Sequence, residues 1–145
     1  MDVRVQEFLS RQRVCVLTTL LLDGSPHGAT LHFSHKDTPF ELYVGTTRES
    51  RKVEALLSGD SIKAAMVIGF SEEEWKTIQL DGEVQIAKDD ELESIHTIHY
   101  EKHPQARRYK ASDETVFLKF TPYWWRFSDL NSDPPDIISS ERREQ

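Results

Sequence analysis

The chain has 145 residues, of which 37% are hydrophobic, and its 18 basic and 25 acidic side chains give a formal net charge of -7. This length predicts one compact domain. The acidic balance argues against nucleic acids and anionic membrane surfaces as partners, because both require a basic footprint. The charge is uneven, since residues 1–71 carry 8 basic and 8 acidic side chains and residues 72–145 carry 10 and 17. We therefore expect any site for a small anion to lie in the first half.

The cysteine content and hydropathy indicate a cytoplasmic protein. Cys15 is the sole cysteine of the sequence, so it cannot form an internal disulfide, and its apolar neighbours favour an inert core thiol. The longest apolar run, residues 14–22, has 9 residues. A membrane-spanning helix needs about 20. The N-terminus leads into charged amphipathic sequence, unlike a secretory signal.

The first half of the chain predicts three strands between two helices. Residues 3–12 have the apolar spacing of an amphipathic helix. Asp23-Gly24 is a strong hairpin signal. Residues 46–57 are predicted as a helix, because Thr46 and the glutamate three positions later have capping-box spacing. The strands are expected over residues 14–22, 27–34 and 40–45.

The second half predicts four more strands and one helix. Residues 62–70 are apolar enough for a central strand, and residues 75–87 alternate as a long one. Residues 90–103 are predicted as a helix that ends before Pro104. Two further strands are expected over residues 114–120 and 123–127.

This order of elements favours a mainly β fold, an antiparallel barrel with flanking helices, over a doubly wound parallel sheet. Strands joined by hairpins, with few helices between them, are typical of such barrels. We expect one domain over residues 1–130. Residues 131–145 contain a Pro-Pro pair and a charged end, and they predict an acidic, poorly ordered tail.

The predicted strand over residues 27–34 has one apolar and one polar face. Its apolar face carries His27, Ala29, Leu31 and Phe33, and its polar face carries Gly28, Thr30, His32 and Ser34. The polar face would place hydrogen-bonding groups outside a barrel core.

Arg48, Arg51 and Lys52 put three cations at the start of the predicted helix over residues 46–57. The positive end of a helix disfavours cations by roughly 0.3–1 kcal/mol each. The same cations, with nearby hydroxyls and unpaired backbone N–H groups, suit a phosphate. The alternative is that they extend into solvent, since surface charge runs are common.

Three strand-and-turn segments carry a resemblance to a known family. They are Val16-Leu17-Thr18-Thr19 with Asp23-Gly24-Ser25-Pro26-His27, Tyr43-Val44-Gly45-Thr46 with Ser50-Arg51-Lys52-Val53, and Trp75-Lys76-Thr77-Ile78 with Leu80-Asp81-Gly82-Glu83-Val84. Over about residues 14–129 the chain resembles the pyridoxamine 5'-phosphate oxidase-like superfamily of FMN-binding split barrels, and most of all its short general-stress-protein-like members. The resemblance implies a six-stranded split barrel that forms a homodimer, with one FMN in each of two clefts between subunits.

The resemblance also implies cofactor-binding residues. The phosphate and ribityl chain would contact Gly45, Thr46, Ser50, Arg51 and Lys52. The isoalloxazine ring would run along Ala29, Thr30, Leu31, His32, Phe33 and Ser34. Thr77 stands where pyridoxamine phosphate oxidases have a glutamine that contacts the ring. Trp125, or its neighbour Trp124, stands where a C-terminal aromatic residue approaches the cofactor.

The sequence departs from true pyridoxamine phosphate oxidases at the substrate positions. Those enzymes carry a basic residue at each end of the second-strand segment, where this chain has Ala29 and Ser34. They also end in an Arg-Leu-His-type motif, whereas residues 126–129 read Arg-Phe-Ser-Asp. The substrate phosphate would lack its usual partners, so oxidation of pyridoxamine phosphate is not expected.

His96, His99 and His103 are spaced i, i+3, i+7 on one face of the predicted helix over residues 90–103. Imidazoles at this spacing could bind zinc or a similar metal. The alternative is a partly solvated helix with half-buried histidines. His32 could contact the flavin or face the dimer interface, and both readings stay open.

The main functional hypothesis is a homodimeric FMN-binding oxidoreductase. No side chain stands out as an obligatory acid or base, which suits a reaction carried by the flavin. The alternative is a non-catalytic flavin- or haem-binding sensor of the same fold, with His32 or a helical histidine as haem ligand. A third hypothesis is an interaction module whose acidic tail contacts a partner.

Overall fold

The computed structural model describes residues 1–109 and 114–140. Its helices are α1 (Val3–Arg11), α2 (Arg51–Glu54) and α3 (Leu92–Lys102), with short 3-10 segments at Asp89–Glu91 and Pro104–Tyr109. Its strands are β1 (Val14–Leu20), β2 (Pro26–Lys36), β3 (Glu41–Thr47), β4 (Ile62–Ile68), β5 (Lys76–Ile86), β6 (Thr115–Asp129) and β7 (Asp136–Ser139).

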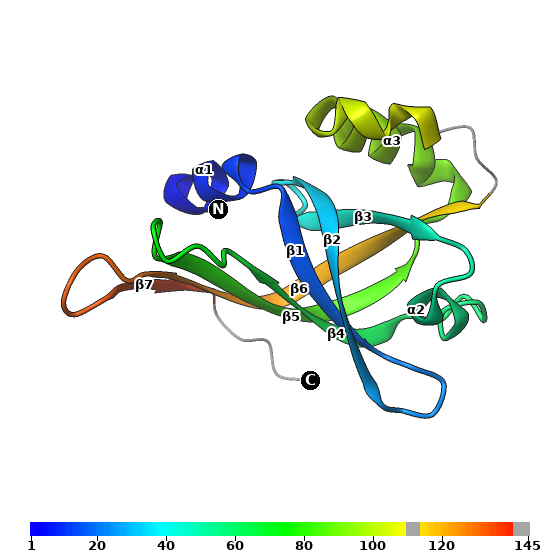
Figure 1. Ribbon diagram of the computed structural model, residues 1–145, viewed down its shortest axis with the longest axis horizontal. Coiled ribbons are helices and arrows are strands. Elements are labelled where there is room, and N and C mark those ends of the chain that lie inside the picture. The colour runs from blue at the N-terminus through cyan, green and yellow to red at the C-terminus, as the bar shows by residue number, and fades with distance from the viewer. Residues whose placement is uncertain (110–113, 141–145) are drawn as a thin grey trace.

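Strands β1 to β6 form a closed antiparallel barrel, as the sequence predicts (Figure 1). Their order is β3-β2-β1-β4-β5-β6, and pairing of β3 with β6 closes the circle. Leu42 pairs with Phe120 in that closing ladder, and both side chains are buried. Closure removes the unpaired strand edges that an open sheet would expose.

Alternating apolar residues of the six strands fill the barrel, and two helices cover it from outside. Val5, Phe8 and Leu9 of α1 are buried in the same core, and the Phe8 ring meets the Phe127 ring edge-on at 5.3 Å between centroids. Helix α3 packs against β2 and β3 (Figure 1). This places its histidine face over the outer side of two barrel strands.

Strand β6 runs without a break where the sequence predicts two strands. Pro122 lacks a backbone N–H and would interrupt a regular ladder. The register between β5 and β6 shifts at Asp81/Gly82, so that Gly82 lies opposite Pro122 and Tyr123 is left over. This β-bulge accommodates Pro122, which has no backbone N–H, so β6 continues as one strand of 15 residues.

Gly82→Ala is expected to destabilise the protein by about 3 kcal/mol, because the bulge leaves no room for a side chain. A Cβ there would lie 2.3 Å from the Thr121 carbonyl oxygen and 2.9 Å from the Phe120 ring. Gly28→Ala is the matched control, since its Cβ would meet only ordinary contacts, the nearest at 3.6 Å. Thermal unfolding measures both variants. Equal melting temperatures for the two would contradict the bulge geometry.

The predicted helix over residues 46–57 is wrong for most of its length. Thr46 and Thr47 belong to β3, where they pair with Val116 and Thr115. Helix α2 spans only Arg51–Glu54, and its N-cap residue, Ser50, makes no capping hydrogen bond with its side chain. The macrodipole of a helix of one turn is negligible, so any anion site here depends on the side chains.

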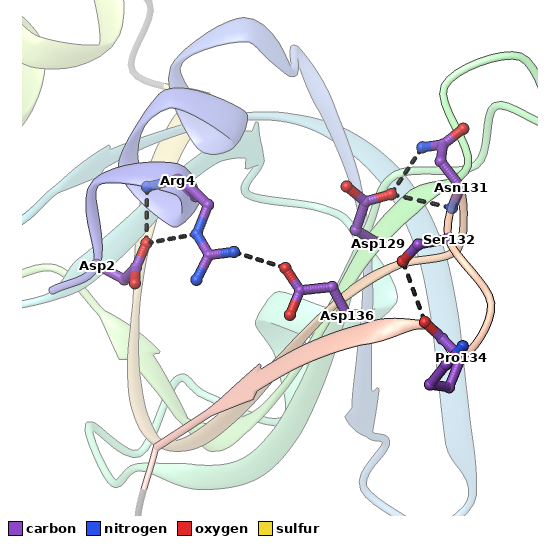
Figure 2. A network of polar contacts seen from close by, with 7 residues as sticks. All are labelled: Asp2, Arg4, Asp129, Asn131, Ser132, Pro134 and Asp136. Carbon is purple, nitrogen blue, oxygen red and sulfur yellow. Dashed lines mark hydrogen bonds and ion pairs between the residues drawn. The ribbon is translucent and has the colours of Figure 1, made fainter.

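Part of the predicted disordered tail is a strand. Strand β7 pairs with β6, and residues 141–145 lie outside the described residues. Figure 2 shows how β7 is joined to the first helix: the Asp2 carboxylate accepts from the Arg4 backbone N–H at 2.8 Å, and the Arg4 guanidinium donates to Asp136 at 2.5 Å. The two ends of the described chain therefore hold each other on one side of the barrel.

Within residues 1–109 and 114–140, no helix has the length and apolar character needed to cross a membrane.

Candidate cofactor-binding site

A cavity of about 510 Å³ lies between α3 and the barrel strands β2, β3 and β6. Its lining residues share an apolar or uncharged character, apart from Glu114 and two imidazoles. They are Val14, Thr30, Leu31, His32, Gly45, Thr46, Thr47, His99, Tyr100, Ala106, Glu114, Thr115 and Phe117. Five of them, Thr30, Leu31, His32, Gly45 and Thr46, are among the cofactor-binding residues that the sequence predicts.

Strand β2 presents its polar face to this cavity. Thr30 and His32 are exposed and lie opposite Val16 and Val14 of β1. The alternation predicted for residues 27–34 is therefore confirmed. Phe33 is fully buried in the core, and Ala29 pairs with the buried Leu17. Their side chains do not line the cavity, so only their backbone could follow a ligand there.

Helix α3 supplies a buried imidazole to the opposite wall. His99 is 4% exposed, and its Nδ1 lies 2.8 Å from the Ser34 hydroxyl. The Phe117 ring meets the His99 ring edge-on, with centroids 5.1 Å apart. Burial, and then the nearby His103, His32, Lys102 and His96, lowers the pKa of His99 to about 3. The imidazole is therefore neutral at physiological pH.

Gly45 keeps the cavity open between the helix and the barrel. A Cβ at this position would lie 3.4 Å from the Phe117 ring and 4.0 Å from His99 Nε2. The Nε2 side of His99 thus faces Gly45 and the cavity, while its Nδ1 side faces Ser34. A larger residue than glycine would occupy this space.

His103 lies behind the cavity wall and is fully buried. Its Nε2 donates to the Phe33 carbonyl oxygen at 2.7 Å, and its Nδ1 has no hydrogen-bond partner among the described residues. Its ring lies 4.9 Å from that of His99 and 5.0 Å from that of His32. Over the described ranges, no three histidine, cysteine, aspartate or glutamate side chains are placed to hold a metal ion.

The predicted phosphate residues lie at the end of β3 and at the start of α2. Thr46 lines the cavity, and its hydroxyl lies 3.5 Å from that of Ser50 at the start of α2. Lys52, two residues further on, is only 6% exposed. Its ammonium group has no hydrogen bond or ion pair among the described residues, and burial lowers its pKa. Arg51 beside it is exposed.

Thr77 and Trp125 do not line this cavity in a single chain. The Thr77 hydroxyl donates to the Ile68 carbonyl oxygen at 3.2 Å and borders a separate hollow with Phe70 and Trp75. Trp125 packs partly against the barrel core, and Ser140 holds its backbone N–H at 2.9 Å. The structure therefore brings the β2 and β3 residues together at the cavity, where Ser50, Arg51 and Lys52 are not among the lining residues. Ser50 adjoins the cavity only through its contact with Thr46, and Thr77 and Trp125 lie apart.

The sequence does not predict the cavity wall formed by Tyr100 and Phe117, and it offers His99 as a metal or haem ligand or as a half-buried structural histidine. Both Tyr100 and Phe117 read locally as core residues of a helix and a strand. A signal for Tyr100 is its place next to His99 on the buried side of the helix, whereas Phe117 lies on β6 and is reached only through the fold.

The family profile of pyridoxamine 5'-phosphate oxidase matches residues 1–129. The chain belongs to this family. A solved haem-binding protein from Mycobacterium smegmatis is similar in fold, with a TM-score of 0.74 and 14% identity, over 92% of this chain and 54% of that protein. This chain thus spans about half the length of that protein.

Two stress-protein structures share the fold over nearly their whole length. General stress protein 26 from Bacillus anthracis has a TM-score of 0.67 and 23% identity, over 94% of this chain and 96% of that one. A Clostridium acetobutylicum protein related to general stress protein 26 has a TM-score of 0.71 and 16% identity, over 97% and 96%. No curated protein matches this member of the pyridoxamine 5'-phosphate oxidase family.

Proposed function

We propose that this protein binds FMN, with the phosphate at Lys52 and the ring in the cavity under α3. The observation that carries the proposal is Lys52, whose side chain is largely buried while its ammonium group has no hydrogen bond or ion pair among the described residues. Burying a cation without a counter-charge is costly, and proteins retain such a group where it binds something. Membership of the pyridoxamine 5'-phosphate oxidase family supports FMN as the ligand whose phosphate binds Lys52.

The cavity suits a flat aromatic ring. Its volume of about 510 Å³ lies within the range of small-molecule sites, roughly 300–1,000 Å³. The Phe117 and Tyr100 rings offer apolar surface, and Thr30 and His32 offer hydrogen bonds from the exposed face of β2. Thr46 connects this end to the phosphate end through its contact with Ser50.

A homodimer is part of the proposal. Thr77 and Trp125 lie away from the cavity of their own chain, so we infer that a second copy brings them to the cofactor. The outer barrel face next to β2 carries half-buried Val16 and exposed Val67, which an approaching copy would cover. The cofactor would then lie between two subunits, with each supplying one wall.

The proposed activity is oxidoreduction of a small molecule other than pyridoxamine phosphate. Bound FMN supplies hydride or electron transfer, and the protein residues bind and orient it. Ser34, which stands where pyridoxamine phosphate oxidases have a cation, is fully buried and bonded to His99. It cannot hold a substrate phosphate, so the substrate-binding arrangement of those oxidases is missing on this side.

The test is an absorbance spectrum of the purified protein, followed by titration with FMN and with riboflavin. We expect flavin bands and an affinity for FMN about tenfold or more above that for riboflavin, because a charge-assisted phosphate contact is worth roughly 1.5–3 kcal/mol. Haem is the second candidate ligand, since His32 and His99 both line the cavity. A Soret band with no flavin affinity would favour haem and overturn FMN.

A further inference from the structure

His99 and Ser34 form a buried pair that the proposed phosphate site does not use. Both side chains are nearly inaccessible, with His99 4% and Ser34 0% exposed. Among the residues that the structure describes, the Ser34 hydroxyl has one hydrogen-bond partner, His99 Nδ1 at 2.8 Å. A buried polar pair of this kind fixes the direction in which the imidazole points.

The hydrogen bond between Ser34 and His99 can run in two directions, and they differ in which nitrogen of His99 carries the proton. If Nδ1 donated to Ser34, the serine proton would be buried without an acceptor, which is costly. If Ser34 donates to Nδ1 instead, both groups are satisfied on that side. His99 is neutral, so its proton then lies on Nε2. The Nε2 side faces Gly45 and the cavity.

We propose that His99, oriented by Ser34, donates a hydrogen bond from Nε2 to the edge of a flat heteroaromatic ring bound in this cavity. The ring must carry an acceptor, a carbonyl oxygen or a ring nitrogen, at the edge that reaches α3. For the proposed function this ring is the isoalloxazine of FMN, so the inference rests on that function. It adds a residue that hydrogen-bonds to the edge of the ring.

The surroundings of His99 fit this role. Phe117 and Tyr100 pack against its ring at 5.1 and 5.7 Å between centroids, so aromatic surface surrounds the imidazole on that wall. Glycine at position 45 leaves space in front of Nε2. A donor held in a fixed direction in a largely apolar pocket favours ligands whose acceptor lies where it points.

The first test compares His99→Phe with Lys52→Met, using FMN and riboflavin as probes. Phenylalanine keeps the ring and removes the donor, so His99→Phe is expected to weaken both ligands about equally, by about tenfold. Lys52→Met is expected to weaken FMN and leave riboflavin unchanged. His96→Gln is the control, because His96 packs on Phe117 from the same helix without lining the cavity. We expect it to bind both ligands as the wild type does.

The second test needs no variant and holds even if His99→Phe fails to fold. Nitrogen-15 NMR of the wild-type imidazoles should show His99 protonated on Nε2, and this resonance should shift when riboflavin or FMN is added. Inorganic phosphate should not shift it. An Nδ1–H tautomer, or a resonance that ignores bound flavin, would overturn the proposal.

Flavin binding and the role of His99 are tested separately. Wild-type protein that binds neither flavin overturns the FMN function and the role of His99 together. Wild-type protein that binds both flavins, with His99→Phe binding them equally well, overturns the role of His99 alone.

Discussion

Replacing Lys52 with methionine is expected to stabilise the ligand-free protein and to weaken FMN binding, so that the two effects have opposite signs. Methionine fills nearly the same space without a charge, and Lys52 is 6% exposed with no counter-charge among the described residues. Removing its desolvation cost should raise the free energy of unfolding by about 1 kcal/mol, as is common when a functional residue is removed. Losing the phosphate contact should lower FMN affinity by about ten- to a hundredfold.

Urea unfolding without ligand and FMN titration measure the two effects. Lys63→Met is the matched control, because Lys63 lies exposed on β4. It should change neither quantity appreciably. A Lys52 variant that is less stable, or that binds FMN as well as the wild type, would show that the ammonium group serves the fold and not an anion.

The barrel strands are predictable because local patterns of apolar and polar residues specify them. The alternation at residues 27–34 and the apolar run of β4 each specify a strand and its inner face. The sequence predicts two strands in place of β6, because Pro122 is typical of a strand break. The bulge that accommodates it places the extra residue Tyr123 of β6 opposite the Asp81/Gly82 step of β5. It depends on this pairing with a distant strand, so no local pattern of β6 contains it.

The helix predicted from Thr46 is a second case in which long-range strand pairing overrides a local sequence signal. Thr46 and Glu49 have the spacing of a capping box, yet Thr46 pairs with Val116 in the ladder that closes the barrel. A backbone ladder and the burial of its apolar neighbours outweigh a cap worth about 1 kcal/mol. Local helix signals next to a strand end are therefore weaker evidence than they look.

The candidate site was half predictable for a related reason. Thr30, His32, Gly45 and Thr46 follow from strand alternation and from family resemblance, and all four line the cavity. The part played by His99 depends on α3 packing across β2, which brings it to Ser34 from 65 residues away. The sequence predicts half-buried histidines on this helix, whereas His99 and His103 are 4% and 0% exposed.

Acidification from pH 7.5 to pH 5 is expected to destabilise the protein. Burial lowers the pKa of His99 to about 3 and also lowers the pKa values of His103 and His35. The unfolded chain, in which a histidine has its ordinary pKa near 6.5, therefore binds more protons than the folded one below that pH. The free energy of unfolding falls as pH drops, by up to about 1.4 kcal/mol per pH unit for each such histidine.

The Ser34→Ala/His99→Phe double variant measures how much His99 contributes to the pH dependence of the free energy of unfolding. Removing both partners of a buried hydrogen bond costs little, whereas removing one leaves the other unsatisfied. The groups that face His99, namely His103, His32, Lys102 and His96, stay in place. Urea unfolding at pH 7.5, 6 and 5 should give the double variant a shallower loss of stability, by up to one proton per molecule. Parallel pH profiles would mean that His99 is protonated in the folded protein, and a donor at Nε2 would then no longer depend on Ser34.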